Sequence, residues 1–316
     1  MSAASGIVTV GLNPAIDRVL EVKNFTLGAH QQGREVLRLP AGKSLNVSRA
    51  LSRLGIANTA TGFLGRDNRD EFLTVLEQLH VVDEFFLLPG RTRENVTIAD
   101  PLARQETHIR QEGLHVGQQD LHRLHRKLQF LSHEGVIIVF SGSLPPGISH
   151  EQFAEVVSMC AEGGARVAVD TGGDVIRSLD IEKLWLVKPN RQELADLVGK
   201  DLTDERQEIA AAADLARGID VVLLTRGAQG ALMFTGSKVY KGHVGLDEDC
   251  VKNTVGCGDA MLGAFIAAHL KHHQPEQAFA QAIACATASA CSMEPADFEI
   301  GLMDELEQKV VIEELA

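Results

Sequence analysis

The chain has 316 residues, of which 45% are apolar and 23% charged, and it carries a formal net charge of −13 at pH 7. A chain of this length and composition can bury a large core, which excludes a wholly disordered protein and suits one large α/β domain. The negative charge argues against nucleic acid or an anionic membrane as a partner, because both favour a basic face. The N-terminus lacks a signal-peptide pattern and no run of about 18 apolar residues occurs, so we expect no membrane association and a cytoplasmic location.

Short runs rich in Val, Ile and Leu recur along the chain and are typical of buried parallel strands. They cover residues 7–10, 136–140, 166–169, 184–187 and 221–224. Helical patterns separate most of these runs, with apolar residues at helical spacing over 47–54 and again over 72–79. This alternation predicts a doubly wound α/β fold, in which helices flank a mostly parallel sheet.

Two segments, residues 17–40 and 85–112, break the alternation with shorter and more polar stretches that predict antiparallel strands. We expect them to meet as a small sheet, inserted in a single domain that spans residues 1–316, and to form a lid over one end of it. A sheet of this size is too small to be stable alone, so we expect the lids of two subunits to pair in a homodimer.

The stretch LPAGKSLNV at residues 39–47 contains Gly-Lys-Ser, the last three letters of a Walker A loop. That motif needs a glycine five positions before Gly42, where this chain has Leu37. A leucine does not readily take the positive φ that the loop requires. We therefore reject a P-loop nucleotide hydrolase, and Gly42, Lys43 and Asn46 need another explanation.

The segment NTVGCGDAMLGAF at residues 253–265 predicts a turn of small residues that opens directly into an apolar helix. The free N–H groups of this helix start, from Gly256, Cys257 and Gly258, would form a concavity that suits an anion such as a phosphoryl group. Asp259 follows in the first helical turn, where its carboxylate could accept a proton from an attacking hydroxyl. The alternative is an acidic residue that merely stabilises the helix start.

Cys257 lies among these N–H groups, and the helix dipole predicts a lowered pKa for its thiol. We expect it to be the cysteine most sensitive to alkylation, although an inert small residue that fills the turn is an equally good interpretation. The cysteines are odd in number, scattered and free of Cys-x-x-Cys pairs, which predicts neither a disulfide framework nor a zinc cluster.

The segment at 253–265 resembles the second signature of the ribokinase/PfkB family of carbohydrate kinases, which ends in Gly-x-Gly-Asp. Other blocks similar to that family occur in its order along nearly the whole chain: GLNPAIDR at 11–18, AGKSLNVSRALSRLG at 41–55, GFLGRDN at 62–68, GRTRENV at 90–96, SGSLPPG at 141–147, VKPNRQEL at 187–194 and TRGAQGAL at 225–232. They are most similar to the phosphosugar branch, which contains 1-phosphofructokinase, tagatose-6-phosphate kinase and the non-allosteric 6-phosphofructokinase. The resemblance implies a ribokinase-like fold and a kinase that uses ATP and Mg²⁺.

The resemblance also implies roles for individual residues. Asp259 would be the catalytic base, and Gly256, Cys257 and Gly258 would form the anion hole. The sugar or its phosphate would be bound by Asp17, Gly42, Lys43, Asn46, Arg93 and Ser143, and ATP by Lys188, Asn190, Thr225, Gly227 and Gly230. Asn190 and Glu193 would hold Mg²⁺ through water, since Mg²⁺ gives up its water shell reluctantly.

Without the resemblance, several of these residues have a plain structural interpretation. They would be a turn residue (Asp17), a surface arginine (Arg93), a loop serine (Ser143), a helix N-cap with a first-turn acid (Asn190 and Glu193) and a hairpin turn (residues 225–230).

The chain departs from the family pattern at two places. The family usually has glycine where this chain has Ser44, which bears on the local backbone geometry. Members that phosphorylate fructose 6-phosphate often have a basic pair where this chain has Ala29-His-Gln-Gln32, which bears on the substrate. Arg34 or Arg38 could compensate for the missing pair. We therefore expect in-line phosphorylation of fructose 1-phosphate to fructose 1,6-bisphosphate, with tagatose 6-phosphate or fructose 6-phosphate as alternative substrates. A catalytically inactive regulator that binds sugar phosphates is a further alternative.

Overall fold

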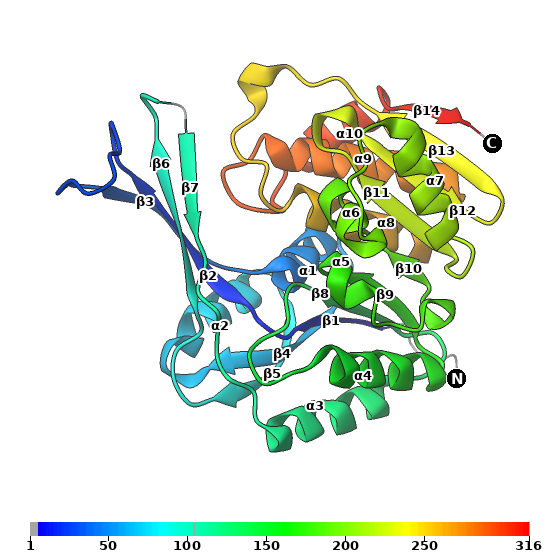
Figure 1. The fold of residues 1–316 in the computed structure, drawn as a ribbon, viewed down its shortest axis with the longest axis horizontal. Coiled ribbons are helices and arrows are strands. Elements are labelled where there is room, and N and C mark those ends of the chain that lie inside the picture. Colours follow the sequence, from blue (N-terminus) through cyan, green and yellow to red (C-terminus); the bar gives the residue numbers. More distant parts are fainter. Residues whose placement is uncertain (1–5, 104, 316) are drawn as a thin grey trace.

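The computed structural model describes residues 6–103 and 105–315, which form a large α/β body with a small sheet projecting from it (Figure 1). Within these residues the main sheet has ten strands in the order β14-β13-β12-β11-β10-β9-β8-β1-β4-β5. They are β1 (Ile7–Gly11), β4 (Thr59–Gly65), β5 (Val82–Leu88), β8 (Ile137–Ser141), β9 (Arg166–Asp170), β10 (Leu186–Val187), β11 (Val221–Thr225), β12 (Ala231–Thr235), β13 (Lys238–His243) and β14 (Val311–Glu314). The strands from β5 to β11 pair in parallel, whereas β12, β13 and β14 pair antiparallel. The predicted α/β fold is confirmed, and every predicted apolar run overlaps one of these strands.

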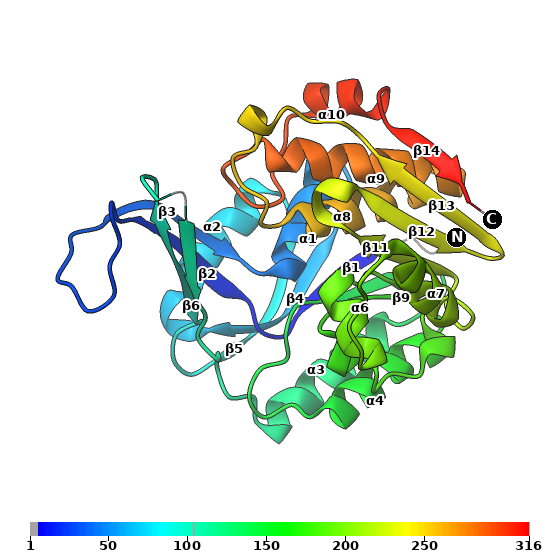
Figure 2. The same ribbon diagram turned by 45° about the horizontal axis from the view of Figure 1, so that its top comes forward.

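Helices cover both faces of the main sheet (Figure 2). They are α1 (Lys43–Arg53), α2 (Arg69–Gln78), α3 (Gln118–Leu131), α4 (His150–Glu162), α5 (Gly173–Ile176), α6 (Arg191–Val198), α7 (Glu205–Leu215), α8 (Cys257–Leu270), α9 (Pro275–Ala290) and α10 (Ile300–Glu307). Helices α3, α4, α6 and α7 pack on one face, and α1, α8, α9 and α10 on the other. In the part of the chain that the structure describes, no helix is long and apolar enough to cross a membrane.

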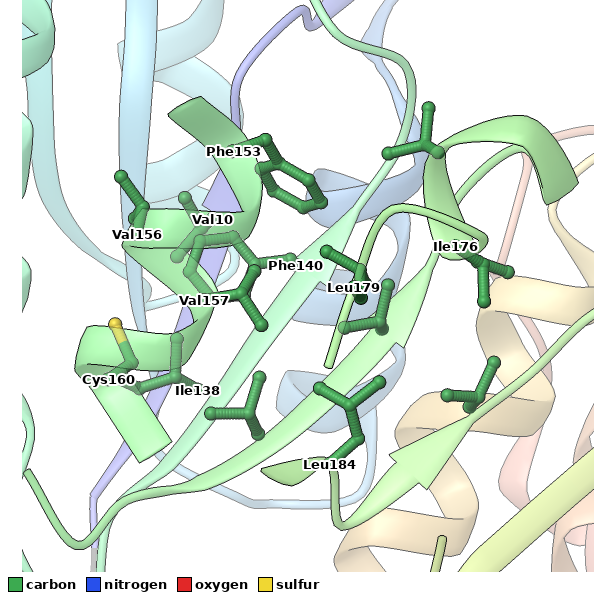
Figure 3. Close-up of a cluster of buried hydrophobic side chains, with 14 of the residues drawn as sticks. Val10, Ile138, Phe140, Phe153, Val156, Val157, Cys160, Ile176, Leu179 and Leu184 are labelled. Carbon is green, nitrogen blue, oxygen red and sulfur yellow. The ribbon is translucent and has the colours of Figure 1, made fainter. Parts of the chain in front are cut away.

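A dense apolar core lies between the main sheet and α4 (Figure 3). The ring of Phe140 in β8 meets that of Phe153 in α4 edge to face, with 5.4 Å between centroids. Val10, Ile138 and Cys160 are buried beside them. Because such interiors are close-packed, the strand ends that follow these residues are held in fixed positions.

The lid is a separate four-stranded sheet in the order β3-β2-β6-β7. Its strands are β2 (Ala15–Glu21), β3 (Arg34–Ala41), β6 (Glu94–Asp100) and β7 (Gln105–Ile109). The two expected segments therefore do meet in space, but β2 pairs in parallel with β6, so the expectation of a wholly antiparallel lid is wrong. The chain passes through α1, β4, α2 and β5 between β3 and β6, and it re-enters the lid in the direction of β2.

The second lid segment also begins later than the sequence indicates. Residues 85–88 belong to β5, which pairs in parallel with β4 at the edge of the main sheet. Because β5 is only half buried, it shows the polar alternation that is also typical of a lid strand.

Strands β1 and β4 approach each other closely at their carboxyl ends, where Gly11 lies opposite Gly62. Gly62 has a φ of +128°, and a Cβ atom there would lie 1.9 Å from the carbonyl oxygen of Gly11. Both the backbone conformation and the available space therefore require glycine at position 62.

We predict that Gly62→Ala lowers the free energy of unfolding by about 3 kcal/mol or more, because the strain of a positive φ adds to the steric clash. Gly55→Ala is the matched control, since Gly55 has a φ of +73° but a Cβ atom there meets nothing within 4 Å. It should cost about 1 kcal/mol. Urea denaturation followed by circular dichroism measures both values, and equal losses would contradict the steric explanation.

Candidate active site

The turn before α8 depends on a glycine. Gly256 is the N-cap of α8 with a φ of +83°, and a Cβ atom there would lie 2.7 Å from the amide nitrogen of Ala296. Among the described residues no side chain caps this helix. The amide of Cys257 donates one long hydrogen bond of 3.5 Å to the carbonyl oxygen of Thr254, whereas the N–H group of Gly258 is free to bind an anion. The structure has the turn and helix start that the sequence indicates, and their role as an anion hole stays a prediction.

Asp259 lies in the first turn of α8 and is almost fully buried, with 5% of its surface exposed. Nδ2 of Asn46, in α1, donates a hydrogen bond of 2.8 Å to its Oδ2. Burial, together with the nearby carboxylate of Asp170, raises the pKa of Asp259 to about 7. A carboxyl group with this pKa exchanges a proton near neutral pH, as a general base must.

Two lysines and a second buried carboxylate lie beside Asp259. Nζ of Lys43 is 2.9 Å from Oδ1 of Asp170, and Nζ of Lys188 is 3.1 Å from its Oδ2. Burial alone would raise the pKa of Asp170, but Lys188 and Lys43 outweigh it and hold the pKa below its ordinary value. The environment thus moves the pKa values of the two carboxyl groups apart, since Asp170 is kept ionised while Asp259 titrates near neutrality.

Asp170 is not among the residues that the sequence singled out. It ends β9 at the carboxyl edge of the parallel sheet, which is where open α/β sheets bind their ligands. The run RVAVD at 166–170 is a buried strand closed by an acidic residue, and this pattern could have identified it.

Lys43 begins α1, and its ammonium group also lies 3.0 Å from Oε1 of Glu193. Burial alone would lower the pKa of Lys43, but Asp170 and Glu193 raise it above its ordinary value, so the side chain stays charged. The resemblance assigns Glu193 to Mg²⁺, and Asp170 also pairs with Lys188, which the resemblance assigns to ATP. Sugar binding by Lys43 stays a prediction, and its polar side-chain contacts within the described residues are with these two carboxylates.

A cavity of about 830 Å³ opens beside the start of α8. Among its lining residues are Asn190, Thr225, Gly227, Gly230, Cys257 and Gly258, all singled out by the sequence, and the apolar Val244, Leu246, Val251 and Ile283. Lys188 lies beneath it, since a Cβ atom on Gly258 would be 3.1 Å from its Nζ. An apolar slot that ends at free helix N–H groups suits a nucleotide, with the base in the slot and the phosphates at the helix.

Asn190 and Glu193 form a capping box at the start of α6. The Glu193 amide donates to Oδ1 of Asn190 (2.9 Å), and the Asn190 amide donates to Oε2 of Glu193 (2.8 Å). Their plain structural interpretation is therefore correct. Oε1 of Glu193 lies outside the cap but accepts the 3.0 Å contact from Nζ of Lys43. Because both carboxylate oxygens already have partners, the pair fits Mg²⁺ held through water better than direct ligation. Residues 6–103 and 105–315 contain no cluster of His, Cys, Asp or Glu side chains that could enclose a metal ion.

Arg93 joins the lid to the loops that follow β1 and β8. It donates hydrogen bonds of 2.8 Å to the carbonyl oxygens of Asn13 and Gln111, and its Nη2 lies 3.4 Å from Oγ of Ser143. Ser143 also accepts a hydrogen bond of 3.2 Å from Nδ2 of Asn13. Arg93 is therefore not an isolated surface arginine, and it meets Ser143 as both predicted roles require.

Asp17 lies in strand β2 and is not a turn residue. Its Oδ1 accepts a hydrogen bond of 2.9 Å from Nδ2 of Asn95, which the sequence did not single out. Burial raises the pKa of Asp17, although Asn95 and Arg93 oppose the shift.

Helix α1 begins where the chain leaves the lid. Its N-cap Gly42 has a φ of +116°, and a Cβ atom there would lie 3.1 Å from Cα of Pro14. Ser44 lies in the first turn of α1, and a Cβ atom on Gly11 would lie 2.2 Å from its Oγ. The departure from the family's usual glycine is therefore accommodated by the helix and by Gly11.

Leu37 lies in strand β3, which rules out a Walker loop.

The expectation for Cys257 is wrong. Burial raises the pKa of its thiol to about 11, although a hydrogen bond to Ser289 opposes the shift. Loss of contact with water outweighs the helix dipole at this position. Cys250 is exposed, so a modifying reagent should reach it before Cys257.

The protein is similar to carbohydrate kinases along nearly its whole length. The model of the family described as pfkB family carbohydrate kinase matches residues 4–299. The chain belongs to this family. As a pfkB-family kinase it is a sugar phosphotransferase, and the use of ATP follows from that class.

Relatives of this pfkB-family kinase point to phosphosugars. A 1-phosphofructokinase of Bacillus subtilis is 31% identical over 289 residues, which cover 91% of this chain and 93% of that protein. A tagatose-6-phosphate kinase of Staphylococcus epidermidis is 30% identical over 275 residues, covering 86% of this chain and 87% of that protein. The crystal structure of phosphofructokinase-2 from Escherichia coli in complex with potassium has the same fold, with a TM-score of 0.88, 23% identity and coverage of 96% of this chain and 98% of that one.

We predict that Asp170→Asn lowers the free energy of unfolding by about 3–5 kcal/mol, because it removes the carboxylate partner of the buried Lys188. Asp120→Asn is the control, since Asp120 pairs with Arg123 on the exposed side of α3, where the loss should be under about 1 kcal/mol. Chemical denaturation at pH 7 measures both variants. A loss for Asp170→Asn as small as that of the control would contradict a structural role for the buried pairs.

Proposed function

We propose that the protein transfers the γ-phosphoryl group of ATP to O6 of fructose 1-phosphate, giving fructose 1,6-bisphosphate and ADP. The observation that carries this proposal is the buried Asp259, whose pKa is raised to about 7, at the uncapped start of α8. Cys257 and Gly258, just before it, line the large cavity, and Asn46 links it to the helix that begins at the lid.

In this mechanism, ionised Asp259 accepts the proton of the attacking hydroxyl while the new oxygen–phosphorus bond forms and the bond to ADP breaks. The N–H groups of Gly256, Cys257 and Gly258 stabilise the charge on the transferring group. Lys43 and Lys188 offset the negative charges of Asp170 and Asp259, so that the phosphoryl group is not repelled from the site.

We propose that Mg²⁺ accompanies ATP and is held through water by Glu193 and Asn190. The contacts of Glu193 support binding through water, because the cap engages one of its carboxylate oxygens and Lys43 the other. When bound, Mg²⁺ supplies positive charge to the phosphate oxygens. ATP itself would lie in the cavity lined by Thr225, Gly227 and Gly230.

The positive charge of Arg93 supports a substrate that already carries a phosphate, since a planar guanidinium suits phosphate oxygens. Arg34 and Arg38 do not replace the missing basic pair, because carboxylates of the lid and of α2 already pair with them. The 1-phosphofructokinase relatives favour fructose 1-phosphate. Tagatose 6-phosphate and fructose 6-phosphate are the alternative substrates.

An inactive sugar-phosphate-binding regulator is less well supported. Such a protein would not need a carboxyl group buried beside the cavity and set to titrate near neutrality, whereas a kinase needs one as its base.

We further propose that residues 1–316 act as one domain and that two subunits pair through their lids. The lid exposes Leu27 (88%), Val36 (39%), Leu102 (62%) and Ile109 (51%), which a second lid would cover. A cytoplasmic location is part of the same proposal.

The substrate proposal predicts the order of kcat/KM for fructose 1-phosphate, tagatose 6-phosphate, fructose 6-phosphate and fructose at fixed ATP and Mg²⁺. Fructose 1-phosphate should be best, and fructose should be poorer by roughly ten- to a hundredfold because it lacks the charged contact. Phosphorus NMR should show a product phosphorylated at both O1 and O6. If fructose is the best substrate, the phosphosugar proposal fails; if a 6-phosphate is best, only the choice of sugar fails.

A further inference from the structure

One face of the lid carries both Asp17 and Asn95. The two residues lie opposite each other in the pairing of β2 with β6, and their side chains are hydrogen-bonded. Oδ1 of Asn95 is buried and has no hydrogen-bond partner among the described residues. An unpaired buried acceptor next to a predicted sugar-binding carboxylate indicates that a ligand group completes this face.

The next strand extends this face to Arg110. In the antiparallel pairing of β6 with β7, Thr97 lies opposite His108, and their side chains are 3.0 Å apart at Oγ1 and Nδ1. Side chains alternate between the two faces of a strand. Asn95, two residues before Thr97, and Arg110, two residues after His108, therefore share the face of that pair.

Backbone contacts keep Arg110 in this position beyond the end of β7. Oε1 of the neighbouring Gln111 accepts a hydrogen bond of 2.9 Å from the amide of Glu94. The carbonyl oxygen of Gln111 accepts the 2.8 Å hydrogen bond from Arg93. Gln111, which follows Arg110, is thus bonded both to Arg93 and to the residue after it, Glu94.

The guanidinium of Arg110 is exposed and makes no hydrogen bond or salt bridge within residues 6–103 and 105–315. Other lid arginines, Arg18, Arg34 and Arg38, all pair with carboxylates. Arg110 is nevertheless close enough to act on the predicted sugar site, because its charge lowers the pKa of both Asp17 and Arg93, on each of which burial has the larger effect.

Two like charges that lie near each other repel unless an anion lies between them. By the same alternation Arg93, two residues before Asn95, shares this face with Arg110, and the charge of Arg110 acts on Arg93. Neither arginine is within salt-bridge distance of Asp17 among the described residues. A phosphate dianion between the two guanidinium groups would relieve their repulsion and would leave the sugar hydroxyls beside Asp17 and Asn95.

We propose that Arg110 binds, together with Arg93, the phosphate that the substrate already carries, and that it thereby sets the preference for a phosphosugar over a free sugar. This inference rests on the proposed function and deepens it. It assigns the second cation on the sugar side to the end of β7, not to the segment after Gly28 where related 6-phosphate kinases often have a basic pair.

The test compares Arg110→Ala with the wild-type enzyme on fructose 1-phosphate and on fructose. The variant should raise KM for fructose 1-phosphate by about tenfold with little change in kcat, and it should leave kcat/KM for fructose unchanged, since only the phosphate contact is lost. Arg110→Lys should recover most of the loss, because it keeps the charge without the planar fork. Arg34→Ala is the matched control, as it removes one lid arginine whose side chain is 75% exposed and distant from Asp17 along β3.

Calorimetry with fructose 1-phosphate in the absence of ATP gives a second readout, and the dissociation constant should rise in Arg110→Ala by the same factor as KM. Unchanged binding, or an equal loss of kcat/KM for fructose and fructose 1-phosphate, overturns the role of Arg110. A wild-type enzyme that prefers fructose contradicts the proposed function instead, so the two failures are distinguishable.

Discussion

The candidate active site depends on the burial of Asp170 between two lysines. The ion pairs with Lys43 and Lys188 join the start of α1, the end of β9 and the residue after β10, which are far apart in the sequence. An unpaired charge in such a place is unfavourable by several kcal/mol, so the ionised carboxylate is stable only when these elements meet. Asp259 then lies beside two ammonium groups and one carboxylate in a dry environment. Its affinity for a proton is therefore a property of the packed edge of the sheet.

The same arrangement reconciles an acidic protein with anionic substrates. The net charge of −13 would repel both ATP and a phosphosugar, so cations must be placed locally. Lys43 and Lys188 supply positive charge where we place the transferring group, and Arg93 and Arg110 supply it at the lid. Helix α1 connects the two places, because its N-cap Gly42 contacts the chain that enters the lid and Asn46, one turn later, donates to Asp259.

Much of the fold follows from the sequence, because buried parallel strands are continuous apolar runs and the turn at 253–265 needs small residues. The sequence places residues 85–88 of β5 in the lid, because an edge strand has the same half-polar pattern as a lid strand. A site residue could be predicted where the neighbouring sequence explains its residue type, as for Asp259 at a helix start. It was not predictable where contacts join distant segments: the partners of Lys43, the register that places Arg110 beside Asn95, and the burial that reverses the expected pKa shift of Cys257.

The pH dependence of kcat/KM for fructose 1-phosphate tests the role of Asp259 most directly. Burial raises the pKa of Asp259 to about 7, and a general base acts only when it is ionised. The value of kcat/KM should therefore fall as the pH drops below about 7. The substrate phosphate titrates near pH ~6, and its protonation causes a second fall in the rate. Asp259→Asn should show only this second fall, and its rate should be lower than that of the wild type by roughly 10²- to 10⁴-fold. If Asp259 is the base, the wild-type enzyme shows an acid limb near pH 7 that is absent from the variant. Identical profiles for the two enzymes, or a variant with more than half the wild-type rate, would contradict it.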